Sequence, residues 1–262
     1  MRARLPVFAF ALGAMGSVVA GCLFTSDFSG VAGVRPGADD GNVDVDDGSD
    51  GAISPCASGQ HALCNDFDHP GGGFPIPGWN NETGDAGELT LDDTAAVTSP
   101  LSLHAKVTGK GGTPQAYLYR TVFLPAFTAL TVSVDLRIVA CPAPGNSVTV
   151  LYVEPSAKAS FGFAFLGSGA QAVGAGVNGA FTFFTLAKQI PDQVWSHVVY
   201  RIMVKNASTA HLTLTVDGST EVDTDAPSSA MQPQVLLNLG LLGTSAPKGC
   251  ELQFDNYVLD QE

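Results

Sequence analysis

Strict alternation of apolar and polar residues is the feature that most limits the folds open to this chain. Residues 130–138 alternate without a fault, and residues 212–216 repeat the pattern. A period of two places every second side chain on one face of a β-strand. Residues 148–153 and 198–204 are also rich in strand-forming side chains. Because no comparable helical period follows Cys56, the sequence predicts an all-β domain.

Two dipeptides predict tight hairpin turns between these strands. Asp217-Gly218 and Asn178-Gly179 each lie between two strand-like runs. Both dipeptides suit the two-residue turn, which needs positive φ angles. Closely spaced strands with turn signals between them favour two antiparallel sheets packed face to face, as in a sandwich or jelly roll.

A glycine pattern formally matches a dinucleotide-binding fingerprint. Gly174, Gly176 and Gly179 have the spacing G-x-G-x-x-G. A dinucleotide site needs a helix after the glycines, so that its amino terminus meets the phosphates. A strand-like run, residues 180–185, follows instead. We therefore expect a hairpin here and no nucleotide site.

The first residues have the pattern of a secretory signal peptide. Arg2 and Arg4 precede an uncharged apolar run over residues 5–20. This run is short for a membrane span, which needs about 18 residues or more. A basic start, an apolar middle and small residues at the end are typical of signal peptides.

The end of this segment, Val-Ala-Gly-Cys at residues 19–22, resembles the lipobox of bacterial lipoproteins. The resemblance implies a lipoprotein signal peptide over residues 1–21 and lipid attachment at Cys22. The chain would then be held in the bacterial cell envelope by a membrane-inserted lipid. Leu23 follows the cysteine where an Asp would favour inner-membrane retention, so we expect the outer membrane.

Residues 22–55 predict a lipidated, disordered acidic linker. After the cysteine this segment has seven Asp against one Arg and no apolar period. Such a segment cannot bury enough apolar surface to offset its ordering entropy. Its acidic stretch, residues 44–51, lacks the ligand spacing of a calcium-binding EF-hand loop. We expect a solvated spacer that leads to a folded domain at residues 56–262.

Five cysteines are an odd number for an exported chain. Lipid on Cys22 leaves four, which allow three disulfide connectivities in an oxidising compartment. We favour Cys56–Cys64, which closes a short local loop. We also favour Cys141–Cys250, because one cysteine ends a predicted strand and the other begins one. The spacing C-x-x-C is absent from the sequence, which argues against zinc.

Two motifs together resemble the concanavalin A-like jelly roll in its laminin-G-like form. Residues 195–199 read Trp-Ser-His-Val-Val, and residues 212–218 end in a Val-Asp-Gly hairpin. Residues 63–68 and 254–258 are similar to the first and last strands of that family, which pair with each other. The resemblance extends over roughly residues 60–260 and implies a two-sheet antiparallel jelly-roll sandwich.

That strand pairing would bring four oxygen-bearing side chains together: Asp66, Asp68, Asp255 and Asn256. Carboxylate and amide oxygens are ligands that calcium prefers. We therefore expect a structural Ca²⁺ site there. Solvent-facing carboxylates without a metal are the alternative.

Trp79 follows a stretch rich in glycine and proline, residues 71–78, which indicates a loop. An exposed tryptophan on a loop could stack on a sugar ring. The alternative is a residue that closes one end of the sandwich.

Glu221, Asp223 and Asp225 resemble the E-x-D-x-E strand of glycosidases with this fold. In those enzymes the alternating carboxylates point into a cleft, one as nucleophile and one as acid/base. The third carboxylate here is a shorter Asp, which makes the separation of about 5–5.5 Å for retaining catalysis harder to reach. A solvated acidic strand is the alternative.

Charge and motif content limit the functions open to the chain. Only 12 Lys and Arg face 25 Asp and Glu, for a net charge of −13, which argues against nucleic-acid binding. We find no HExxH or G-x-S-x-G motif and no complete catalytic set in a short segment. We expect a non-catalytic recognition module, with a glycan as the first ligand to test. A carbohydrate-active enzyme that uses residues 221–225, or a passive structural or adhesive envelope protein, are the alternatives.

Overall fold

The computed structural model describes residues 54–69, 73–98, 100–109, 114–142, 147–243 and 248–262. Ser49–Glu262 forms one compact unit, which contains every described strand and both disulfides, so it has the core that it needs to fold by itself. The predicted signal peptide, the predicted lipidation site Cys22 and nearly all of the predicted acidic linker lie outside the described residues. Among the helices that are described, none is long and apolar enough to cross a membrane.

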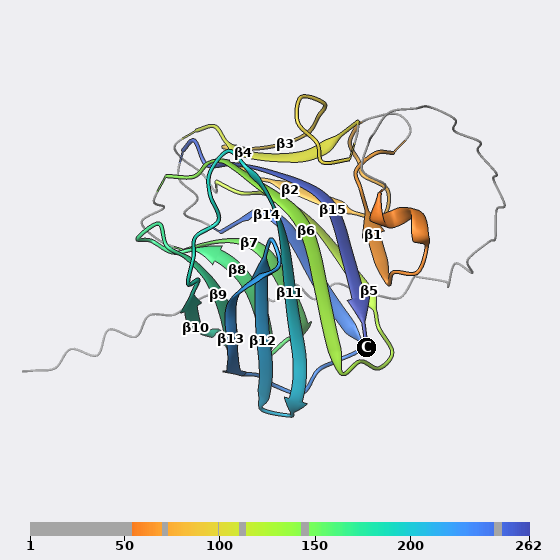
Figure 1. The fold of residues 1–262 in the computed structure, drawn as a ribbon, viewed down its shortest axis with the longest axis vertical. Coiled ribbons are helices and arrows are strands. Elements are labelled where there is room, and N and C mark those ends of the chain that lie inside the picture. Colours follow the sequence, from red (N-terminus) through yellow and green to blue (C-terminus); the bar gives the residue numbers. More distant parts are fainter. Residues whose placement is uncertain (1–53, 70–72, 99, 110–113, 143–146, 244–247) are drawn as a thin grey trace, which may run out of the picture. The chain divides into compact units, whose positions relative to one another are not determined.

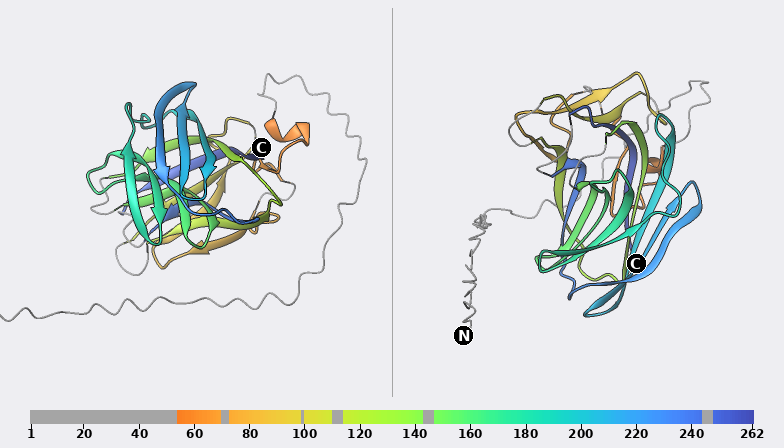
Figure 2. Two further views of the ribbon diagram at one scale, coloured as in Figure 1. Left: turned by 90° about the horizontal axis from the view of Figure 1, so that it is seen from below. Right: turned by 90° about the vertical axis from the view of Figure 1, so that its left-hand side faces the viewer.

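The described residues form two antiparallel sheets, which lie one against the other as two layers (Figures 1 and 2). In spatial order, the eight-stranded sheet consists of β13 (Ser219–Pro227), β12 (Thr209–Val216), β11 (Trp195–Asn206), β6 (Ala129–Ala140), β15 (Glu251–Gln261), β4 (Ser102–Val107) and β3 (Gly87–Asp92), with β1 (Leu63–Asn65) also paired to β15. The seven-stranded sheet consists of β10 (Ala180–Thr185), β9 (Gln171–Val177), β8 (Ala159–Phe165), β7 (Val148–Ser156), β14 (Gln234–Leu242), β5 (Ala116–Phe123) and β2 (Asn80–Thr83). The predicted all-β jelly-roll sandwich is confirmed.

Alternating side chains of both sheets form the core between the layers. On β6 the buried positions include Leu130, Val134 and Ile138, each at most 1% exposed. On β14, Leu237 and Leu239 are fully buried and face the same interior. The strict alternation in the sequence therefore marks which face of each strand packs inward.

Both predicted hairpin turns are confirmed. Asn178 and Gly179 join β9 to β10 with φ angles of 51° and 82°. Asp217 and Gly218 join β12 to β13 with φ angles of 50° and 79°. Positive φ at both central positions is the geometry that a type I′ turn requires.

The first and last strands pair, as the resemblance implied. β1 pairs antiparallel with β15, with Leu63 opposite Leu259. On the same side of β15, β4 pairs with its first half, and β6 occupies the other side. The strand formed last in the sequence therefore lies in the middle of the eight-stranded sheet.

The disulfides join the pairs favoured from the sequence. Cys56, in the short 3₁₀ helix η1 (Pro55–Ser58), is bonded to Cys64 of β1, with their Cα atoms 5.4 Å apart. Cys141 follows β6 and is bonded to Cys250, just before β15, with their Cα atoms 4.0 Å apart. Because β6 and β15 are neighbours, the second bond holds two adjacent strands together at one end.

Candidate functional site

Trp79, expected on an exposed loop, lies in the hydrophobic core. Its side chain is only 5% exposed, and its ring meets Tyr257 edge to face with centroids 5.4 Å apart. Burying a ring of this size contributes to stability because it removes apolar area from water. The ring face is therefore not available to stack on a ligand, and the burial agrees with the alternative, a residue packed into the sandwich.

Glu221, Asp223 and Asp225 lie on β13, an edge strand of the eight-stranded sheet. The Glu221 side chain is buried, and its Oε2 accepts a hydrogen bond of 2.7 Å from the backbone N–H of Lys188. It therefore holds the loop that follows β10. Asp223 and Asp225 are exposed and point to the other side of the strand.

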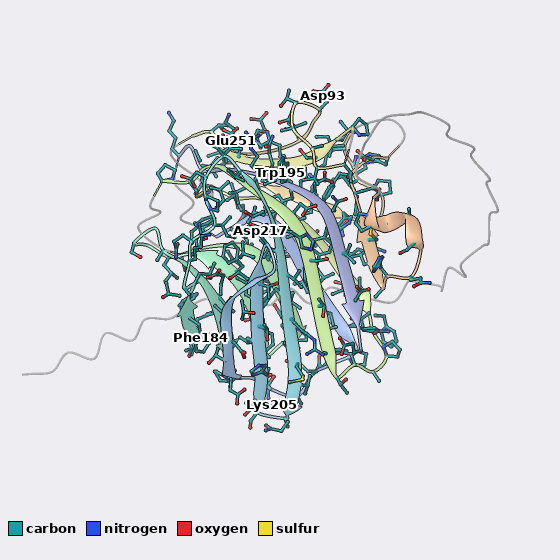
Figure 3. All side chains as sticks on the ribbon, viewed as in Figure 1. Asp93, Phe184, Trp195, Lys205, Asp217 and Glu251 are labelled. Carbon is teal, nitrogen blue, oxygen red and sulfur yellow. A yellow bond between two sulfur atoms is a disulfide. The ribbon has the colours of Figure 1, made fainter. Side chains whose placement is uncertain are left out.

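Asp223 and Asp225 both contact His211 of the neighbouring strand. Asp223 lies 2.8 Å from His211 Nε2, and Asp225 lies 2.8 Å from His211 Nδ1. Lys205 also contacts Asp225 at 2.7 Å, and it lies at the opposite end of β11 from Trp195 (Figure 3). Hydrogen bonds from Lys205 and His211 lower the pKa of Asp225. Since Glu221 faces away from this pair, the three carboxylates do not converge as a catalytic set.

Asp255 fastens a loop to the last strand. Its side chain is fully buried. Its Oδ2 accepts hydrogen bonds from the N–H groups of Val97 (2.8 Å) and Thr98 (2.9 Å). Its Oδ1 accepts one from the N–H of Asn256 (2.8 Å). Burial raises the pKa of Asp255 to about 6, although these N–H groups favour the charged form. The Asn256 amide donates to Oδ2 of Asp135 at 2.8 Å.

Asp66 and Asp68 are likewise engaged in hydrogen bonds. Asp66 accepts a hydrogen bond of 2.6 Å from the hydroxyl of Ser54, and Asp68 accepts one of 2.7 Å from the N–H of Leu101. Burial raises the pKa of Asp68. Within the described ranges, no group of three or more His, Cys, Asp or Glu side chains is arranged to hold a metal ion. This arrangement does not support the expected Ca²⁺ site: the four side chains fix loops to strands instead.

The outer face of the eight-stranded sheet, here called the ionic face, carries a chain of paired polar groups. His197 of β11 lies opposite Asp135 of β6, with its Nδ1 2.7 Å from Oδ1. This hydrogen bond raises the pKa of His197, and the charges of Asp135 and Asp217 add to it. On the same face, Arg137 donates to the Gln253 side chain at 2.9 Å.

The outer face of the seven-stranded sheet, here called the aromatic face, has a different composition. Tyr119, Asn238 and Tyr152 lie directly opposite one another on β5, β14 and β7. Directly opposite residues of antiparallel strands point to the same side. That side is the outer one, because Leu237 and Leu239, on either side of Asn238, face the core.

This row of residues continues across the whole sheet. It is here called the aromatic row, and in spatial order it comprises Asn80, Tyr119, Asn238, Tyr152, Gly162, Gly174 and Phe183. Seven strands at a spacing of about 4.8 Å give a row about 29 Å long. It contains two half-buried phenol rings around a buried central amide, and an exposed phenyl ring at the end.

Two phenylalanines at the end of the row explain the glycines of β9. The rings of Phe181 and Phe183 stack, with centroids 5.9 Å apart and planes 15° apart. A Cβ atom at Gly174 would lie 2.9 Å from the Phe183 ring, and one at Gly176 would lie 2.8 Å from the Phe181 ring. The glycines therefore let the rings lie across β9 while their outer sides stay 47% and 39% exposed for Phe181 and Phe183.

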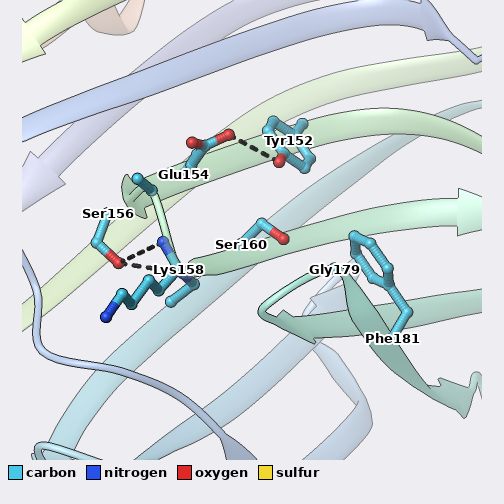
Figure 4. Close-up of a pocket in the computed structure, with 9 residues that line it drawn as sticks. Tyr152, Glu154, Ser156, Lys158, Ser160, Gly179 and Phe181 are labelled. Carbon is cyan, nitrogen blue, oxygen red and sulfur yellow. Dashed lines mark hydrogen bonds between the residues drawn. The ribbon is translucent and has the colours of Figure 1, made fainter. Parts of the chain in front are cut away.

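A hollow of about 180 Å³ lies beside this row, at the turn between β7 and β8 (Figure 4). Tyr152, Glu154, Ser160 and Phe181 line it, and Lys158 lies at the opposite end from Phe181 (Figure 4). The Tyr152 hydroxyl donates to Glu154 at 2.8 Å. Burial, with the Glu154 carboxylate nearby, raises the pKa of Tyr152 to about 12.

The aromatic row was missed from the sequence. Its members lie on strands that are far apart in the chain, and their strand order is not readable from any one segment. A local signal existed in the spacing of Tyr117 with Tyr119 and of Phe181 with Phe183. Aromatic side chains two residues apart share a face, here the outer one.

No family model matches the sequence, and no curated protein is similar to it in sequence. Many solved structures have a similar fold, and three of them are described here. The "Cellulose induced protein, Cip1" has a TM-score of 0.57 and 13% identity, and the match covers 76% of this chain and 97% of that one. The endo-β-1,4-glucuronan lyase of the fungus Trichoderma reesei has a TM-score of 0.55 and 10% identity, and the match covers 77% of this chain and 96% of that one. The carbohydrate esterase vb_24B_21 of the Shiga toxin-encoding bacteriophage phi24B has a TM-score of 0.53 and 13% identity, and the match covers 77% of this chain and 98% of that one. These likenesses establish the jelly-roll architecture.

Proposed function

We propose that the folded domain binds a neutral glycan along the aromatic row and does not cleave it. The observation that carries this proposal is the set Tyr119, Asn238 and Tyr152, side by side on the outer face of three adjacent strands. Aromatic rings stack on the apolar face of a sugar ring. The Asn238 amide between the two tyrosines is only 7% exposed, so the rings carry the proposed contact. Binding sites commonly combine such apolar surface with a few placed polar groups.

The length and exposure of the row favour a chain-like ligand. The row crosses the entire sheet and ends at Phe183, which stays 39% exposed. An extended glycan could therefore meet several side chains in succession. The names of the solved structures with this fold, which include a lyase and an esterase of carbohydrates, also support a glycan ligand.

Charge on the aromatic face favours a neutral glycan over a uronate polymer. Glu154 accepts from the Tyr152 hydroxyl, and Glu82 accepts from the Tyr117 hydroxyl at 2.7 Å. These two carboxylates outnumber Lys158, the cation that lines the hollow, so the net charge beside the row repels the carboxylates of a uronate.

Titration of soluble oligosaccharides into the Ser49–Glu262 fragment tests this proposal. Neutral gluco- and manno-oligosaccharides, and a uronate oligomer of the same length, serve as probes. We expect binding of a neutral probe and at least about tenfold weaker binding of the uronate. Tyr119→Ala and Tyr152→Ala should each weaken the neutral complex by about tenfold or more.

His211→Ala, on the ionic face, is the matched control and should leave the affinity unchanged. Product analysis of the same mixtures tests for cleavage, and we expect none. A fragment that binds none of a broad glycan array would contradict the proposal and favour a passive structural or adhesive role. Loss of binding in His211→Ala alone would place the site on the other sheet.

We also propose that lipid on Cys22 anchors the chain in the bacterial outer membrane. The basic start, the apolar run and the small residues before Cys22 support this anchor. Cys22→Ser should remove incorporation of a labelled fatty acid and release the chain from the membrane fraction. Fatty-acid label that persists in the Cys22→Ser variant would refute the anchor.

A further inference from the structure

The strands at the ends of the two strand orders differ in how they are protected against pairing. On the eight-stranded sheet, β13 carries three carboxylates and β3 carries Glu88 and Asp92. On the seven-stranded sheet, β2 is only four residues long and contains Glu82. β10, with the sequence Ala-Phe-Thr-Phe-Phe-Thr, contains no charged residue and no proline. Charges, short length and proline are the usual protections of an edge, so β10 is the unprotected one.

β10 is also open on its free side. It pairs with β9 alone and lies at the outer edge of the sheet (Figure 1). All of its residues are exposed except Phe184, which is half-buried. Thr182 and Phe183 point to opposite faces and are both exposed, while Phe184 packs partly against the core. An edge strand of this kind presents a row of unpaired N–H and C=O groups.

We propose that β10 pairs antiparallel with the β10 of a second copy of this chain, around a two-fold axis. Continuing the sheet requires that outer-face residues of one copy lie opposite outer-face residues of the other. Centring the axis on Thr182 meets this condition, because Thr182 then lies opposite itself. Phe181 of each copy lies opposite Phe183 of the other, so four phenyl rings share the outer face.

We commit to a second copy because the two-fold register makes β10 complementary to itself, and charge limits the other places where two copies could meet. The chain from Cys56 onward has a net charge of −9, so two copies repel each other over most of their surface. β10 contributes no charge to that repulsion, and a two-fold pairing there places no carboxylate opposite another. The strand is also built from aromatic and β-branched residues, which favour cross-strand pairs.

The pairing joins two seven-stranded sheets into one continuous sheet. The two aromatic faces then meet at the four phenyl rings. This arrangement goes beyond the proposed function and does not rest on it, since pairing requires no ligand. Six residues on each side form a small interface, so we expect a dissociation constant on the order of 10–100 µM.

Sedimentation velocity of the Ser49–Glu262 fragment, from about 1 to about 300 µM, tests the pairing. The wild-type fragment should move from monomer to dimer over this range. Thr182→Lys places two ammonium groups opposite each other and should weaken the dimer by at least about tenfold. Thr83→Lys is the matched control: it makes the same change at an exposed position of β2, the other edge of the sheet, and should leave the dimer unchanged.

A charge-pair experiment tests the two-fold register. An equimolar mixture of Thr182→Lys and Thr182→Glu should dimerise at least as well as the wild type, although each variant alone does not. Hydrogen exchange of the wild type should show slower exchange of β10 amides at high concentration than at low concentration, which requires no substitution. A wild-type fragment that stays monomeric throughout, or a dimer that Thr182→Lys leaves intact, would overturn the proposal.

Discussion

The two outer faces of the sandwich use their side chains in opposite ways. Every ion pair between described residues includes a residue of the eight-stranded sheet. The aromatic face of the other sheet instead presents tyrosines, stacked phenylalanines and a central asparagine. Charged side chains on the first face find partners within the protein, whereas the stacked Phe181 and Phe183 on the second stay 47% and 39% exposed.

This contrast teaches where a ligand gains most from contact. On the ionic face a ligand would have to displace partners such as Asp135 from His197. On the aromatic face it would cover exposed rings without breaking an ion pair. An exposed apolar surface with polar groups beside it is a more informative sign of a site than a cluster of paired charges.

The largest expected effect concerns the crosslink between β6 and β15 in the sheet that bears the ionic face. Cys141 and Cys250 are 109 residues apart in sequence, whereas Cys56 and Cys64 are 8 apart. In the chain-entropy model the disulfide that closes the long loop raises the free energy of unfolding by up to about 4–5 kcal/mol, and the one that closes the short loop raises it by about 2–3 kcal/mol. Cys141→Ala with Cys250→Ala should therefore lower the melting temperature more than Cys56→Ala with Cys64→Ala.

Glycan affinity of the folded double variant, measured at low temperature, sharpens the comparison. If the two faces are independent, Cys141→Ala with Cys250→Ala leaves the affinity of the aromatic row unchanged. A larger loss of stability from the Cys56–Cys64 pair would show that strain or residual denatured structure outweighs loop entropy.

The second effect is a pH dependence of stability that arises on the ionic face. The folded pKa of Asp255 is about 6, above its ordinary value of 3.8, and that of His197 is also raised. Both folded-state groups hold a proton more tightly than the unfolded chain does. Each group stabilises the folded state fully at pH values below its unfolded pKa. This contribution to the free energy of unfolding is lost as pH rises through the folded pKa. The free energy of unfolding should fall by about 1–2 kcal/mol between about pH 5 and pH 8.

Urea unfolding at a series of pH values measures this dependence. His197→Asn keeps a donor towards Asp135 without a titrating ring, and it should flatten the upper part of the profile. Glycan affinity should change little over the same range, because the groups that titrate lie on the other sheet. A wild-type stability that rises from pH 5 to pH 8 would contradict the assigned direction.

The smallest effect tests how loosely the phenyl rings are held. Gly176→Ala places a methyl group 2.8 Å from the Phe181 ring and 2.6 Å from the Ser160 hydroxyl. Because the ring is exposed, it can swing outward, so the expected cost is below about 1 kcal/mol by urea unfolding. The loss of glycan affinity should be larger than this loss of stability, because the substitution disturbs the stacked rings of Phe181 and Phe183. A cost above about 3 kcal/mol would mean that the aromatic face is as rigidly packed as the core.

Local patterns predicted most of the architecture. The alternation at residues 130–138 identified β6 and its buried face, and Asn178-Gly179 and Asp217-Gly218 identified two hairpins. These features depend on short-range sterics and on which face of a strand is buried, and the local sequence determines both. The disulfide pairing followed from where the cysteines lie relative to strands.

The candidate site was harder to predict because it depends on strand order. Tyr119, Asn238 and Tyr152 meet only because β14 lies between β5 and β7, which no local pattern states. Trp79 illustrates the opposite error, since a loop rich in glycine and proline can still direct its ring into the core. Burial of a loop side chain is decided by distant partners such as Tyr257.

The central place of β15 has a consequence for how the chain is made. β15 is flanked by β6 on one side and by β4 and β1 on the other, so the eight-stranded sheet has no middle until its final strand emerges. Synthesis runs from the amino terminus, and contacts between distant segments form slowly. The nascent polypeptide should therefore remain unfolded until β15 has been synthesised. An unfolded chain can pass through a narrow translocation channel, which the amino-terminal sequence predicts that it must do. Removal of residues 251–262 should leave a product that does not fold.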